Sequence, residues 1–185
     1  MPSNKDRLYL ALYARGGAPQ MPGLEDSYHW AFVTGPKVEP KSGGQGTRFH
    51  AKEGLISVGE PPTPQWVWTY EEKPIPLQPT QMLLVRVVIG KIKDQHRVRA
   101  TFERTPIRSE VPGWNCVAWA EEAFRELLRD RKALDKAVDN WDLVRDTAMW
   151  YVEQKKADHR FDGQGQYDQS RAATWDMLLG EELIP

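Results

Sequence analysis

The spacing of the apolar residues changes at Asn115, and this change limits the folds open to the chain. Before Asn115 the apolar residues alternate with a period of two, so that Tyr28, Trp30 and Phe32 share one face of an expected strand. After Asn115 they recur at helical spacing, as in Val117, Ala120, Phe124, Leu127 and Leu128. Strands followed by helices predict an α+β fold, with an antiparallel sheet packed on helices.

Six segments have the composition of strands, and turns rich in glycine or proline separate most of them. They are residues 8–14, 28–34, 47–52, 66–70, 82–92 and 97–103. Segment 82–92 is the most hydrophobic and is expected at the centre of the sheet, whereas the prolines around 66–70 favour a short or edge strand. Segments 28–34 and 47–52 are expected to form a hairpin that carries His29 and His50.

Two helices are expected in the second half of the chain. Asn115 is a good N-cap for the first, and Asp139 or Asn140 caps a second that begins near Trp141. Residues 163–166 read as a loop, after which Thr174 is expected to cap a short last turn. The chain is therefore interpreted as one domain, 1–185, with a core over 1–138 and a C-terminal helical extension over 139–185.

Charge and hydropathy exclude several classes of partner. The 25 Lys and Arg residues nearly balance the 26 Asp and Glu residues, so no net field favours nucleic acid or an anionic membrane. No apolar run approaches the roughly 18 residues of a membrane span. The polar start does not resemble a signal peptide, and a single cysteine suits a reducing compartment, so a cytoplasmic protein is expected.

Cys116 is the candidate nucleophile. It follows the N-cap Asn115, so it lies in the first helical turn, where free backbone amides and the positive end of the helix dipole stabilise a thiolate. Trp114 comes just before this pair and can wall a cleft beside the thiol. The structural alternative is that Cys116 is a small buried hydrophobe, and that Trp114 belongs to the core.

His29 and His50 are candidate acid–base residues. His29 shares its strand face with the small residue Ala31, which leaves room beside the imidazole. If the two strands pair, His50 can orient the His29 ring and fix its tautomer, as a general base requires. A purely structural role for both histidines is the alternative.

Three motifs, taken in order, resemble those of the lecithin:retinol acyltransferase and HRAS-like suppressor proteins, which have a circularly permuted, NlpC-type, papain-like fold. They are the segment Tyr28–Gly35 with its His-Trp-Ala sequence, the segment Arg48–Ala51, and the Asn-Cys pair at 115–116. Val117 and Ala118 stand where that family carries an acidic residue and a histidine. The whole chain is also similar to an uncharacterised fungal family of small proteins.

The resemblance implies a Cys-His-His triad. Cys116 would be the nucleophile, His29 its base and His50 the orienting residue, with Tyr28 near the oxyanion and Asn115 beside the thiol. The implied activity is acyl transfer through an acyl-enzyme, by a thiol hydrolase or acyltransferase acting on a small-molecule or peptide ester, thioester or amide, with no cofactor.

Two other functions stay open on the sequence alone. The first is a non-catalytic module that binds a peptide or protein on the same fold. The second is a zinc-dependent hydrolase, although the spacings 50 − 29 = 21 and 116 − 50 = 66 match no compact zinc motif. The polar cluster near the C-terminus, Asp158, His159, Asp162 and Asp168, is interpreted as solvated. No metal site is therefore expected.

Overall fold

The computed structural model describes residues 5–41, 43–80 and 82–185. Within these ranges it contains one eight-stranded sheet and three α-helices. The strands are β1 (Arg7–Ala14), β2 (Tyr28–Gly35), β3 (Gln45–Val58), β4 (Thr63–Pro76), β5 (Leu83–Ile92), β6 (Leu134–Ala137), β7 (Ala173–Asp176) and β8 (Glu181–Ile184). The helices are α1 (Gln95–Arg104), α2 (Cys116–Arg129) and α3 (Trp141–Ala157), with a 3-10 turn at Glu25–Ser27.

The α+β class is confirmed, but the sheet is mixed rather than antiparallel. Its strand order is β4-β3-β2-β1-β5-β7-β8, with β6 also paired to β5. The β5–β7 pair is parallel, since the chain reaches β7 through a long connection that includes α3. Residues 139–185 thus supply α3 and two strands of this same sheet.

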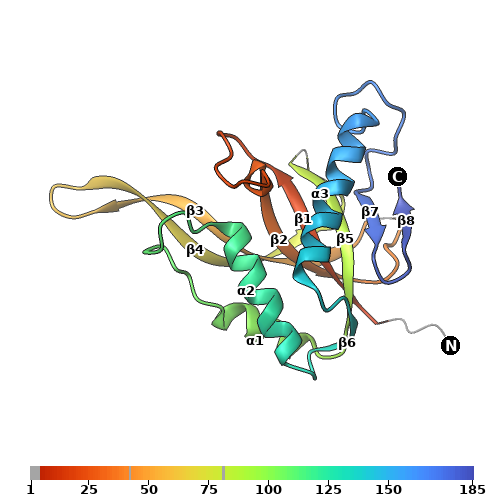
Figure 1. Cartoon of the computed structure of the whole chain (residues 1–185), viewed down its shortest axis with the longest axis horizontal. Helices are drawn as coiled ribbons and strands as arrows, with labels where there is room; N and C mark the ends of the chain where they lie inside the picture. The colour runs from red at the N-terminus through yellow and green to blue at the C-terminus, as the bar shows by residue number, and fades with distance from the viewer. Residues whose placement is uncertain (1–4, 42, 81) are drawn as a thin grey trace.

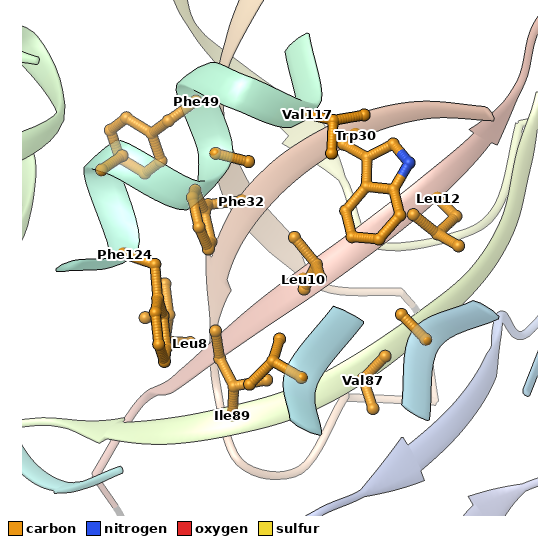
Figure 2. Close-up of a cluster of buried hydrophobic side chains, with 14 of the residues drawn as sticks. Leu8, Leu10, Leu12, Trp30, Phe32, Phe49, Val87, Ile89, Val117 and Phe124 are labelled. Atoms are coloured by element: carbon orange, nitrogen blue, oxygen red, sulfur yellow. The ribbon is translucent and has the colours of Figure 1, made fainter. Parts of the chain in front are cut away.

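The main hydrophobic core lies between the helices and one face of the sheet. Figure 1 shows α2 and α3 side by side over the strands, where α2 packs on β2 and β3, and α3 packs on β5. Leu8, Leu10 and Leu12 of β1 point into this core beside Trp30 and Phe32 of β2, as Figure 2 shows. We call this the helix-covered face.

The opposite face of the sheet carries a second, smaller apolar cluster. Because side chains alternate along a strand, Tyr9, Ala11 and Tyr13 of β1 lie here, together with Ala31 and Val33 of β2. The expected division of the strand 28–34 into two faces is therefore confirmed. His29 has the same parity as Ala31, and its ring contacts Tyr13 with ring centroids 6.1 Å apart.

Segment 97–103, expected as a strand, is helical. Asp94 caps α1 by accepting a hydrogen bond from the Arg97 N–H, and Val98 and Phe102 are buried four residues apart. These two residues fit the helical period as well as the strand period, so the alternation alone was ambiguous over so short a segment.

Two further expectations, for Thr174 and for the strand at 66–70, need correction. Thr174 does not cap a helical turn but lies in β7, and Asp176 accepts the amide hydrogen bonds of the turn that follows it. The strand expected at 66–70 is the centre of β4, which is 14 residues long. It is an edge strand, as its prolines indicated, and with β3 it forms a hairpin that projects from the body (Figure 1).

The two helix N-caps are confirmed. The Asn115 side chain accepts hydrogen bonds from the amides of Val117 and Ala118, at 2.9 and 3.2 Å. Asn140, rather than Asp139, caps α3 by accepting from the Leu143 amide at 3.1 Å.

Candidate functional site

The two predicted histidines lie side by side on the face opposite the helices. Antiparallel pairing of β2 with β3, which includes Phe32 with Phe49, brings the two strands together. His29 Nε2 lies 2.6 Å from His50 Nδ1, and the rings meet edge to face. The hairpin expected from the sequence therefore forms, and it places the two imidazoles in direct hydrogen-bond contact.

Glu71 completes this group from the neighbouring strand. It lies opposite His50 in the β3–β4 register, and its Oε1 is 2.9 Å from His50 Nε2. Lys52 donates to the other carboxylate oxygen, and Arg48 approaches Oε1 at 3.4 Å. The hydrogen bond from Lys52 is the main cause that lowers the pKa of Glu71 to about 2, so the carboxylate is ionised at neutral pH.

Sequence reasoning missed Glu71. It falls just outside the strand expected at 66–70, so its pairing with His50 depended on the full length of β4. No local signal in the sequence marks it, because the apolar alternation of Trp66, Trp68 and Tyr70 ends there and residues 71–73 are all charged.

Both histidines are neutral at pH 7. Burial is the first cause that lowers the pKa of His29 to about 3, and the charges of His50, Arg48 and Arg15 act in the same direction. Burial also lowers the pKa of His50 to about 4, against the opposing hydrogen bond to Glu71. The Glu71 carboxylate offsets only part of the desolvation cost that a charged His50 would carry.

These protonation states fix the tautomers. An ionised Glu71 can only accept, so His50 Nε2 carries the proton of that hydrogen bond. Neutral His50 then has a lone pair on Nδ1, so His29 Nε2 must donate to it. The remaining lone pair of the group is therefore on His29 Nδ1, which has no hydrogen-bond partner among the residues the structure describes.

The histidine pair borders a cavity of about 350 Å³. We call it the histidine cavity; its lining residues are Tyr13, Ala14, Arg15, His29, Arg48, His50, Lys52, Glu53, Trp68 and Met82. A second cavity of about 520 Å³ shares Arg15, Glu53 and Trp68 with it and extends to Trp114 and Asn115. Three basic side chains thus surround a pocket that also contains two neutral imidazoles.

Cys116 does not join this group. Its side chain is 0% exposed and packs in the core under the helix-covered face, whereas His29 has the parity of the opposite face. Burial raises the pKa of the thiol, although the amides of Trp30, Cys116 and Val117 and the charge of Arg15 act in the other direction. Within the described ranges no hydrogen bond links Cys116 to either histidine.

The three residues expected to contact the oxyanion or the substrate are not among those that line the histidine cavity. The Tyr28 hydroxyl donates to Glu153 and accepts from Lys156 at 3.1 Å, next to α3. Asn115 is occupied as the α2 cap, and its Nδ2 faces Met21 Sδ at 3.4 Å. Trp114 packs edge to face on Trp68, with ring centroids 5.6 Å apart, so it walls the second cavity.

One protein family, described as a family of unknown function, matches residues 5–184. The match spans nearly the whole chain. The chain belongs to the DUF6914 family. No curated protein matches it, and no solved structure matches it. The resemblance to the acyltransferases therefore stays a prediction for this DUF6914 protein.

The DUF6914 structure also bears on metal binding and on whether a helix could cross a membrane. Over residues 5–41, 43–80 and 82–185, no group of three or more His, Cys, Asp or Glu side chains is arranged to hold a metal ion. In the same ranges no helix has the length and apolar character needed to cross a membrane.

The chemistry available to the DUF6914 site is proton transfer. His29 Nδ1 has no competing donor among the described residues, and the chain from His29 through His50 to Glu71 can offset part of the cost of the positive charge formed when that nitrogen takes a proton. The neighbouring basic residues can hold a negatively charged group beside it.

Proposed function

We propose that this DUF6914 protein is an enzyme in which His29 acts as a general base on a small molecule bound in the histidine cavity. The observation that carries the proposal is the hydrogen-bonded chain Glu71–His50–His29. It leaves the Nδ1 of His29, a residue that lines the histidine cavity, without a hydrogen-bond partner among the described residues. What a purely structural pair would not require is a free imidazole nitrogen on a residue that lines a cavity, since buried polar groups are normally hydrogen-bonded.

The proposed step is the removal of one proton from water or from a substrate hydroxyl. His29 Nδ1 takes the proton and the attacking oxygen keeps the electron pair, so that the oxygen becomes the nucleophile. The His29 imidazolium keeps its Nε2–H bond to His50, whose own Nε2–H bond to Glu71 remains. Glu71 stays ionised and stabilises the new positive charge across the pair.

Activity of matched histidine variants tests this proposal. Esters and phosphoesters of small acids would be assayed with wild type, His29→Gln and His96→Gln, because His96 is exposed and lies on α1 away from the cavity. We expect His29→Gln to lower kcat by about 100-fold to 10,000-fold and His96→Gln to leave it unchanged. Full activity in His29→Gln would refute the assignment.

Acyl transfer by Cys116 is the second candidate. The observation in its favour is that Cys116 begins α2 and that the amides of Trp30, Cys116 and Val117 favour its thiolate, with Trp30 following His29 directly in the chain. Its test is the pH dependence of alkylation by iodoacetamide in wild type and His29→Ala. A thiolate pKa well below the ordinary value that rises in the variant would support this candidate over the first.

Loss of turnover in Cys116→Ser, with His29→Gln still active, would also support acyl transfer by Cys116 over general-base catalysis by His29. A protein that binds ligand in the cavity but turns over no ester or phosphoester would instead favour the non-catalytic binding module.

A further inference from the structure

Among the residues that the structure describes, Arg15 has no hydrogen-bond or ion-pair partner for its guanidinium group. It lines both cavities, and its guanidinium lies 6.0 Å from the centre of the Trp68 ring. Its Nη1 is buried and forms no hydrogen bond, and within the described ranges Arg15 forms no ion pair at 4.0 Å or less. A buried guanidinium nitrogen without an acceptor carries a desolvation cost that an anion in the cavity would offset.

Arg48 is also incompletely paired. Its guanidinium stacks over Tyr13 at 5.3 Å, and among the described residues its ion pair is the long contact to Glu71 at 3.4 Å. Its Nε is buried without an acceptor. Arg48 shares Glu71 with Lys52 and His50, which make the two shorter contacts to that carboxylate.

The cavity therefore has an excess of positive charge. Arg15, Arg48 and Lys52 line it, and the exposed Glu53 is the acidic residue of its described lining. Glu71 is already bound by Lys52 and His50, and Asp26 lies on the second cavity, where its amide contacts with Gln20 and Met21 hold the carboxylate. Tyr13 and Trp68 supply aromatic walls beside the two guanidinium groups. Arginine binds planar or tetrahedral oxyanions through paired N–H groups, and aromatic rings favour a flat apolar ligand body.

We propose that the histidine cavity binds a small aromatic or apolar ligand through a carboxylate or phosphate group, which Arg15 and Arg48 hold. This inference deepens the proposed function and rests on it for the role of the ligand as substrate. A negative group at this position would also offset the Arg15 and Arg48 charges that disfavour protonation of His29. The substrate would thereby strengthen the base that acts on it.

A titration with matched charged and neutral ligands tests the inference on the unaltered protein. Benzoate and phenyl phosphate would be compared with benzamide at constant ionic strength, by calorimetry and by the ¹⁵N signals of the arginine Nε and histidine ring nitrogens. We expect the two anions to bind and to shift the Arg15 and Arg48 signals, and benzamide to bind at least about tenfold more weakly. Equal binding of benzoate and benzamide would overturn the proposal.

Two arginine variants and a surface control locate the site. We expect Arg15→Gln and Arg48→Gln each to weaken binding of the anions by roughly tenfold to 100-fold. Arg131→Gln, which removes the same charge from an exposed position, should leave binding unchanged. Equal losses in all three variants would overturn the site, since they would reflect net charge alone.

The two readouts separate this inference from the proposed function. Anion binding with shifted arginine signals, but with His29 protonated on Nδ1, would leave the anion site standing and remove the base. A His29 signal that shows an unprotonated Nδ1, without anion binding to wild type, would leave the base standing and remove the anion site. A preference for phenyl phosphate over benzoate would assign the ligand group to phosphate, and the reverse to carboxylate.

Discussion

We expect the protein to lose stability between pH 7 and pH 5, and we expect replacement of the paired histidines His29 and His50 to remove most of that loss. In the folded state burial holds the pKa of His29 at about 3 and that of His50 at about 4, against an ordinary value of 6.5 for each. Below pH 6.5 the unfolded chain therefore binds protons that the folded chain does not. Stability is fully present above pH 6.5 and is lost as the pH falls towards the folded-state values.

The magnitude follows from the width of this window. Between pH 7 and pH 5 one such histidine takes up a proton in the unfolded state but not in the folded state. Integrated over this range, the difference in bound protons amounts to about 1.4 pH units, and each unit is worth about 1.4 kcal/mol of unfolding free energy. Each histidine thus accounts for about 2 kcal/mol, and the pair for about 4 kcal/mol, of lost unfolding free energy. Glu71 adds nothing in this range, because its window lies between 4.5 and about 2.

Urea denaturation at pH 7 and pH 5 measures this loss directly. We expect the unfolding free energy of wild type to fall by about 4 kcal/mol, that of His29→Gln or His50→Gln by about half as much, and that of the double variant by little. The control His96→Gln, at an exposed position, should behave as wild type. A double variant with the wild-type pH dependence would refute the claim that the pair is buried in the neutral state.

Three further outcomes follow from the structure. Glu71→Gln removes the carboxylate that favours protonated His50, so we expect the His50 pKa to fall further; an NMR titration that finds a rise would contradict this. Asn115→Ala loses both cap hydrogen bonds of α2 and should cost about 1–2 kcal/mol of unfolding free energy in urea, whereas no change would mean that the cap is dispensable. Cys116 is buried with a raised pKa, so its alkylation in the folded protein should be on the order of 100-fold slower than in urea, and equal rates by intact mass would show that the thiol is accessible.

The sequence predicted the parts of the site that depend on local pattern. The alternation around Trp30 assigned His29 to one strand face, and the hairpin expected from strands 28–34 and 47–52 brought His50 next to it. The side-chain type of Asn115 was enough to locate the start of α2. Each of these features depends on residues within one strand, one helix end or one pair of neighbouring strands.

The rest depended on tertiary packing. Alternation separates His29 from Trp30 and Phe32 but does not say which face the helices cover. In the fold the bulky pair Trp30 and Phe32 packs under α2, and the thiol of Cys116 goes with them, so the nucleophile and the base expected from the sequence lie on different faces. The choice of covered face comes from the whole core rather than from the motifs.

Strand length and register were the other limit. The prolines around residues 66–70 favoured a short or edge strand, and β4 is an edge strand but a long one, because an edge strand tolerates proline where its outward N–H groups need no partner. The longer β4 carries Glu71 into register with His50, and this single pairing turns two adjacent histidines into a polarised chain. No local pattern in the sequence indicated that pairing.

The protonation of His29 at neutral pH tests the central claim most directly. Long-range ¹H–¹⁵N correlation spectra of the labelled protein at pH 7 distinguish protonated from unprotonated ring nitrogens, and His29→Gln and His50→Gln assign the signals. We expect protons on Nε2 of both His29 and His50, with an unprotonated Nδ1 on His29. A proton on His29 Nδ1, or a charged His29 at this pH, would contradict the account.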